Sequence, residues 1–124
     1  MDRRQLGELG EKIAEKHLKE KGYKILDRNF SKRFSSGPLV GEIDLIAKKD
    51  GMISFIEVKA LSGKTPFFPE QKVNLKKKRK IARMAQIWLQ DHNVPLDRKW
   101  GIDVISITID PKRSEIKHFK NIII

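Results

Sequence analysis

The chain has no cysteine among its 124 residues, which excludes both disulfide bonds and metal sites built on thiolates. Long apolar runs are also absent, and none approaches the roughly 20 residues that a membrane-spanning helix needs. The chain begins MDRRQL and so lacks the apolar stretch of a secretory signal peptide. We therefore expect a cytoplasmic protein with no membrane partner.

Acidic residues are few relative to basic ones. The chain has 27 lysines and arginines against 16 aspartates and glutamates, which gives a net charge of +11 at pH 7. A small protein with this balance usually binds a polyanion, with nucleic acid favoured over an anionic membrane. The length predicts a single domain over residues 1–124, and no internal repeat divides it.

Apolar residues at helical spacing predict two helices. The first covers residues 3–21 and is ended by Gly22, and the second runs from about 70 to 92. Their inward stripes are Leu6, Leu9, Ile13, Ala14, His17 and Leu18 in the first, and Ile81, Met84, Ala85, Trp88 and Leu89 in the second.

Five runs rich in β-branched and aromatic residues predict strands. An Asp50-Gly51 pair between the second and third runs is a strong tight-turn signal and predicts a hairpin. The polar stretches 31–38 and 61–69 predict loops. The expected order is α-β-β-β-α-β-β, a compact α/β sandwich, with strands at about 23–30, 41–47, 53–60, 101–109 and 115–120.

The two strands of the predicted hairpin carry charges where a buried strand is normally apolar. Glu57 and Lys59 stand two apart on one strand, and Glu42 and Asp44 on the other, so each pair faces one side. If the strands pair, Asp44, Glu57 and Lys59 converge, and two carboxylates beside an ammonium form a hard-cation site with a water-handling group. This pattern predicts a metal-dependent phosphodiesterase. The alternative is an ordinary ion pair of Lys59 at a sheet edge.

Basic residues gather around this region. Lys32 and Arg33 precede the Glu42 strand in a predicted loop, which either closes over a phosphate backbone or is a solvated connection. The second helix carries seven cations within twelve positions with no acid between them, which favours contact with a polyanion. These are Lys72, Lys76, Lys77, Lys78, Arg79, Lys80 and Arg83.

Other charged or apolar residues have simpler interpretations. Glu11 lies at the edge of the apolar face of its helix, and Asp103 is the one charge in its strand, where it stabilises the fold. The three histidines have no ligand spacing and are read as structural or surface residues. The apolar end at 122–124 either packs into the core or contacts a second copy in a homodimer.

Three motifs carry a family resemblance: Gly10-Glu11, the run Gly41-Glu42-Ile43-Asp44-Leu45-Ile46, and the run Phe55-Ile56-Glu57-Val58-Lys59. Together they resemble the PD-(D/E)XK restriction-endonuclease-like superfamily, and more narrowly the YraN-like family of bacterial endonuclease-like proteins. The similarity extends through Val73, Lys77, residues 85–89 and Ile102-Asp103-Val104. Two positions depart from the pattern: Ile43 stands in place of a proline, and Gly101 in place of an arginine.

The resemblance implies a three-layer α/β/α sandwich around a central mixed sheet. It implies that Asp44, Glu57 and the Val58 carbonyl bind Mg²⁺ or Mn²⁺, with Glu11 reaching the metal directly or through water, as in archaeal Holliday-junction resolvases. Lys59 would orient or deprotonate the attacking water, Glu42 would support the ligands, and Lys77 and its neighbours would hold flanking phosphates.

The function expected on these grounds is a DNA endonuclease that selects branched or flapped structures, since no base-reading element is evident. The first alternative is a non-catalytic nucleic-acid-binding protein that keeps the fold. The second is an RNA-directed or ribosome-associated factor, which the high positive charge favours but the acidic pair does not.

Overall fold

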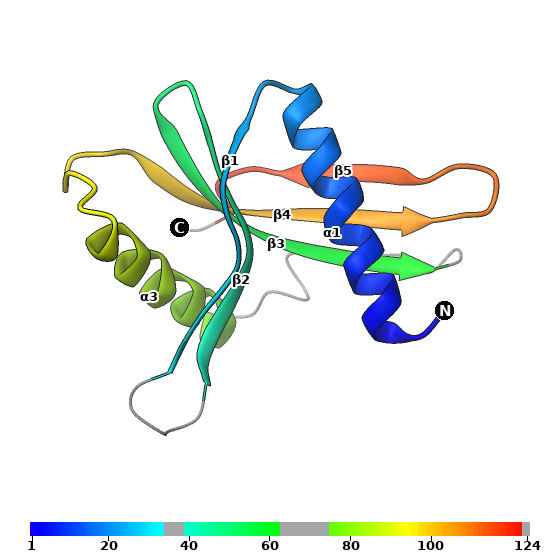
Figure 1. Ribbon diagram of the computed structural model, residues 1–124, viewed down its shortest axis with the longest axis horizontal. Helices are drawn as coiled ribbons and strands as arrows, with labels where there is room; N and C mark the ends of the chain where they lie inside the picture. The colour runs from blue at the N-terminus through cyan, green and yellow to red at the C-terminus, as the bar shows by residue number, and fades with distance from the viewer. Residues whose placement is uncertain (34–38, 63–74, 123–124) are drawn as a thin grey trace.

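The fold is described from a computed structural model over residues 1–33, 39–62 and 75–122. Two helices and a five-stranded sheet make up these parts of the chain (Figure 1). Along the chain they are α1 (Arg3–Glu20), β1 (Lys24–Arg33), β2 (Leu39–Lys49), β3 (Met52–Ser62), α3 (Leu75–Asp91), β4 (Trp100–Ile109) and β5 (Glu115–Phe119).

The sheet is mixed, and its strands lie in the order β1-β2-β3-β4-β5. Only β3 and β4 are parallel, while the other three neighbouring pairs are antiparallel. A parallel pair needs a long crossover connection, and the connection between β3 and β4 contains α3. The protein is therefore a mixed α/β protein with a mostly antiparallel sheet.

Helix α1 begins and ends where the sequence predicts. Asp2 caps it: its carboxylate accepts a hydrogen bond from the Gln5 amide at 2.8 Å, and the Gln5 side chain accepts one from the Asp2 amide at 3.0 Å. At the other end Gly22 has a φ of 92°, a conformation that few residues other than glycine adopt easily, and the chain leaves the helix.

The predicted hairpin is also confirmed. Lys49 pairs with Met52, so the loop between β2 and β3 has two residues, Asp50 and Gly51. Both have positive φ values, 52° and 76°, as a type I′ turn requires. The turn matches the twist of the two strands and fixes their register.

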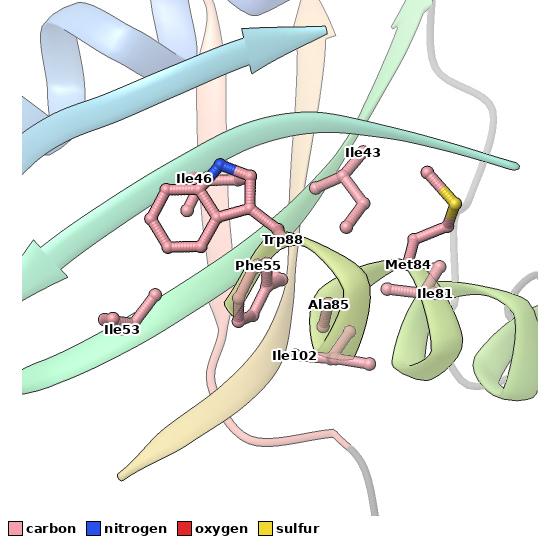
Figure 2. Packing of buried hydrophobic residues seen from close by; sticks show 9 residues of the cluster. All are labelled: Ile43, Ile46, Ile53, Phe55, Ile81, Met84, Ala85, Trp88 and Ile102. Atoms are coloured by element: carbon pink, nitrogen blue, oxygen red, sulfur yellow. The ribbon is translucent and has the colours of Figure 1, made fainter. Parts of the chain in front are cut away.

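Two apolar clusters lie on the two faces of the sheet, one under each helix. The α1 cluster is formed by Ala14, Leu18, Leu45, Ala47, Ile56, Ile105 and Ile107. Figure 2 shows the α3 cluster, in which Ile81, Met84, Ala85 and Trp88 pack on Ile43, Ile46, Ile53, Phe55 and Ile102 from the sheet.

Two predicted loops are wrong at their start. Leu61 and Ser62 belong to β3, since they pair with Thr108 and Ile109 of β4. Residues 31–33 belong to β1, since Ser31 pairs with Glu42 and Lys32 with Gly41. The polar side chains of this stretch predict a loop. Strand pairing, however, is made by the backbone amide and carbonyl groups and does not require apolar side chains. The rest of that loop, the loop over 63–69 and the predicted helix start at 70–74 lie outside the described residues.

Asp103 stabilises the fold, as predicted. The residue is 1% exposed, and its carboxylate accepts hydrogen bonds from His118 Nε2 at 2.8 Å and the Asn121 amide at 2.9 Å. The following residue, Ile122, donates its amide to the Ile102 carbonyl at 2.9 Å and packs against the α3 cluster. A Cβ at Gly101 would meet Asn121 Oδ1 and Met52 Cε, so a larger residue here, such as the arginine of the resemblance, would displace these side chains.

Across the described ranges, neither helix has the length and apolar character needed to cross a membrane.

Candidate active site

The candidate site lies where the sheet divides. The ladder between β2 and β3 runs from Lys49 and Met52 at the turn to Leu45 and Ile56, and ends there. Beyond this point β2 remains paired with β1, and β3 with β4. In Figure 1 the β1–β2 arm consequently runs away from β3, β4 and β5, which continue to the right. We call this division the fork.

Asp44 occupies the apex of the fork, next to Leu45 of the last ladder pair and on the side where β2 and β3 separate. Its Oδ2 accepts a hydrogen bond from the backbone amide of Val58 on β3 at 2.8 Å. The Asp44 side chain thus takes the place that a backbone carbonyl of β2 would have in a continuous ladder. Burial raises the pKa of Asp44 to about 6, and the negative charges of Glu57 and Glu42 add to this, while the Val58 bond opposes it.

Glu57 and Lys59 share a face of β3, as strand alternation predicts. Lys59 Nζ lies 3.0 Å from Glu57 Oε1, and Lys77 of α3 forms an ion pair with the same oxygen. The other oxygen, Glu57 Oε2, is buried and has no hydrogen-bond partner among the described residues. One oxygen of this carboxylate therefore faces two ammonium groups, while the other has none.

The two lysines respond differently to this shared partner. Burial lowers the pKa of Lys77, and the positive charge of Lys59 acts in the same direction. Burial also acts to lower the pKa of Lys59, but the carboxylates of Glu57 and Asp44 oppose this and the pKa of Lys59 is raised.

Glu11 approaches from α1. Its Oε1 is buried without a hydrogen-bond partner among the described residues. Burial and, to a smaller extent, the negative charges of Asp44, Glu42 and Glu8 together raise the pKa of Glu11 to about 7, so Glu11 is within electrostatic range of the fork. It lines a second cleft of about 450 Å³ together with Leu45. The structure thus brings Glu11 near Asp44 from a different side than Glu57.

An open cleft of about 460 Å³ lies between the fork and α3. Carboxylates of β2 and β3 form one side of it, and lysines from the first two turns of α3 form the other. Gly41 allows this close approach, since a Cβ there would lie 3.0 Å from Met84 Cγ. The lining residues are Gly41, Glu42, Asp44, Glu57, Lys76, Lys77, Lys80 and Ile81.

The remaining basic residues are distributed more widely. Arg79 is exposed on α3, while Lys32 lies 3.3 Å from Asp91, the last residue of α3, at the opposite end of that helix from the cleft. The side chain of Arg33 and the whole of Lys72 lie outside the described residues. Sequence reasoning placed Lys77 among the phosphate contacts and missed its pairing with Glu57.

A signal for the Lys77 contact is nonetheless present in the sequence. Lys77 stands four residues before Ile81, seven before Met84 and eleven before Trp88, so it continues the inward stripe of α3. A lysine on the buried stripe of a helix needs a partner, because an unpaired buried charge is costly.

The oxygens gathered here fit a hard divalent cation by their chemistry. Carboxylates are the ligands that Mg²⁺ and Mn²⁺ prefer, and one oxygen each of Glu11 and Glu57 is buried without a hydrogen-bond partner among the described residues. No three Asp, Glu or His side chains within the described ranges already surround a single point at ligand distance. The two lysines at Glu57 account for part of this, since they occupy one of its oxygens.

Comparison with known proteins identifies the family. Residues 10–107 match the family described as "Uncharacterised protein family UPF0102". A UPF0102 protein of Alkaliphilus oremlandii is 37% identical over 120 residues, which cover 95% of this chain and 97% of that protein. Another, from Caldanaerobacter subterraneus subsp. tengcongensis, is 32% identical over 123 residues, covering 99% and 95% of the two chains. The chain therefore belongs to the UPF0102 family, which is the YraN-like family that its motifs resemble.

Proposed function

We propose that this protein is a divalent-cation-dependent endonuclease that hydrolyses phosphodiester bonds in DNA. The observation that carries the proposal is the pair of buried carboxylate oxygens, Glu11 Oε1 and Glu57 Oε2, that have no hydrogen-bond partner among the described residues and belong to side chains within electrostatic range of Asp44. Leaving such oxygens uncompensated costs free energy. A site that is costly to maintain and opens into a cleft is typical of functional residues.

The cation would be held by Asp44, Glu57 and the Val58 carbonyl, with Glu11 reaching it directly or through water. When bound, it would neutralise charge on the scissile phosphate and lower the pKa of an attacking water. Glu42 is exposed and adds negative charge next to Asp44 and Glu11, which strengthens the attraction for a cation.

The lysines supply the rest of the chemistry. Lys59 stays protonated beside Glu57, so its ammonium can orient the water by hydrogen bonding and offset the charge that develops on the phosphate. Lys76 and Lys80 line the opposite wall of the cleft, where they would bind phosphates on either side of the scissile bond.

The same arrangement supports membership of the restriction-endonuclease-like superfamily. The observed succession of one helix, three strands, a crossover helix and two strands fits the expected sandwich. An Asp at a division of the sheet with a Glu-x-Lys on the neighbouring strand fits the motif that gives the superfamily its name.

Selection by DNA structure is favoured over selection by base sequence. The cleft is open and its wall is made of lysines, which contact phosphates rather than base edges. A second candidate is a nucleic-acid-binding protein without catalysis, favoured by the two ammonium groups that already neutralise Glu57.

The test is cleavage of labelled four-way junction, flap, single-strand and duplex DNA, with matched RNA, in Mn²⁺, Mg²⁺ or EDTA. We expect cleavage by the wild-type protein that is lost in EDTA and in Asp44→Asn and Glu57→Gln proteins. Asp97→Asn, at an exposed position, is the matched control and should cleave normally. The side-chain carbonyl introduced by Asp44→Asn could still accept the Val58 hydrogen bond, so the fold should persist.

Two results would count against the proposal. Equal cleavage by wild-type and Asp44→Asn proteins would remove Asp44 from the mechanism. Binding of every substrate without cleavage, unaffected by EDTA, would establish the non-catalytic alternative, and a preference for RNA would reassign the substrate.

A further inference from the structure

Lys77 differs from the other lysines of the cleft in what it contacts. Lys76 and Lys80 are exposed, whereas the Lys77 side chain is 35% exposed and stands on the inward stripe of α3. It reaches across to Glu57 Oε1 on β3, so a helix that faces the cleft directly contacts a carboxylate of the proposed cation site.

The Glu57 carboxylate is shared by more positive groups than one negative charge can balance. Lys59 Nζ and Lys77 Nζ both pair with Oε1. A divalent cation at Glu57 would be a third positive group within a few ångströms, and like charges at that distance repel strongly in a partly buried site. Lys59 is fixed two residues away on the same strand, while Lys77 comes from the opposite wall and has an alternative anion to bind, a phosphate entering the cleft.

We propose that Lys77 competes with the divalent cation for Glu57, and that a nucleic-acid phosphate in the cleft relieves this competition by pairing with Lys77. This inference rests on the proposed nuclease function. Lys77 is in this account a positioning residue that makes cation and DNA binding cooperative. The cation would bind weakly to the protein alone and more tightly once the backbone of a substrate lies along α3, which confines loading of the site to the DNA-bound protein.

The test compares Mn²⁺ affinity in Lys77→Met and Lys80→Met proteins, with free Mn²⁺ quantified by its electron paramagnetic resonance signal. Both variants remove one positive charge from the same cleft, but of these two lysines it is Lys77 that forms an ion pair with Glu57. Methionine suits the inward stripe, so Lys77→Met should fold. We expect Lys77→Met to bind Mn²⁺ about fivefold or more tighter than Lys80→Met, the lower end of ordinary coupling between sites.

A second arm adds a short duplex with phosphorothioate linkages to slow hydrolysis. Addition of the duplex should tighten Mn²⁺ binding by wild-type and Lys77→Arg proteins, since arginine keeps the charge, and tighten it less in Lys77→Met, where only the direct attraction of the phosphates for the cation remains. Equal Mn²⁺ affinities in Lys77→Met and Lys80→Met would reduce the effect to general electrostatics and overturn the inference.

Weaker Mn²⁺ binding by Lys77→Met than by wild-type protein would also overturn it, since Lys77 would then be holding Glu57 in place for the cation. A failure of the nuclease proposal itself looks different. In that case wild-type protein would bind no Mn²⁺ with or without DNA, or would bind it equally well after Asp44→Asn.

Discussion

Asp44 is the residue at which the proposed chemistry and the stability of the fold are opposed. The pKa of Asp44 rises from 3.8 to about 6, and that of Glu11 from 4.5 to about 7, chiefly through burial. A raised carboxyl pKa means that the folded state binds more protons than the unfolded state between the two values. The free energy of unfolding should therefore fall as pH increases from about 4 to about 7.

Asp44→Asn should consequently stabilise the protein above pH 7. The asparagine carries no charge to desolvate and can still accept the Val58 hydrogen bond, so we expect a gain of about 1–3 kcal/mol at pH 8. Urea unfolding at pH 8 and pH 4 measures it, and the gain should shrink toward zero at pH 4. At a concentration high enough to overcome the competition from Lys77, added Mn²⁺ should stabilise the wild-type protein but not Asp44→Asn. An Asp44→Asn protein no more stable than Asp97→Asn at pH 8 would contradict this account of Asp44.

The sequence predicts much of the site at this scale. Alternation along β3 correctly puts Glu57 and Lys59 on one face, because that rule depends only on local backbone geometry. It could not predict that the Asp44 carboxylate turns to the Val58 amide, since this depends on where the ladder ends. The contact of Lys77 with Glu57 depends on how α3 crosses β3, which residue spacing does not determine.

At the scale of single elements, the packing of α1 on β3 sets the depth of Glu11. The helix comes so close at Gly10 that a Cβ there would lie 2.6 Å from Ala60 Cβ and 3.8 Å from Val58 Cγ1. Any side chain at this position would move α1 away from the sheet. The absence of a side chain at Gly10 thus lets α1 lie close to the sheet, and this brings the Glu11 carboxylate toward the fork.

Gly10→Ala and Gly7→Ala should have opposite effects on stability. Both glycines are inside α1, where alanine is favoured by up to about 1 kcal/mol, and a Cβ at Gly7 meets nothing within 4 Å. Gly7→Ala should stabilise by that amount, whereas overpacking in Gly10→Ala should destabilise by about 1–3 kcal/mol. Urea unfolding of both variants gives the comparison. If both alanines stabilise equally, the close approach of α1 to β3 is wrong.

Elements with strong local signals are the ones that the sequence predicts best. The extent of α1, which ends at Gly22, and the Asp50-Gly51 hairpin are each determined within a short stretch of chain. The extension of β1 to Arg33 is not determined locally. It depends on the pairing of residues 31–33 with β2, which their polar side chains do not indicate.

For the whole molecule, the distribution of charge matters more than its sum. The net charge is +11, and six of the 27 lysines and arginines lie in the first nine positions of α3, with no acidic residue among them. If this helix docks the phosphate backbone, binding should weaken with salt in proportion to the phosphates that it neutralises.

Lys76→Met and Lys80→Met should each reduce the salt dependence of duplex binding. Each removes one lysine of the cleft wall, so the slope of log affinity against log salt should become less steep by about 0.9. Fluorescence anisotropy between low and moderate salt measures the slope. Lys112→Met, exposed between β4 and β5, is the matched control and should leave it unchanged. A similar reduction in all three proteins would mean that charge spread over the surface, rather than α3, binds the DNA.

The fork also has a mechanical consequence. The α3 helix packs mainly on β2 and α1 mainly on β3, while the apolar cluster under each helix also includes residues of the other arm. In a pair of hinged arms the ends travel far while the hinge scarcely moves. Asp44 and Val58 are joined at the hinge, so any widening of the arms to admit a bulkier nucleic acid would leave their hydrogen bond intact. Tolerance of differently shaped substrates and constancy of the reacting geometry would thus come from the same division of the sheet.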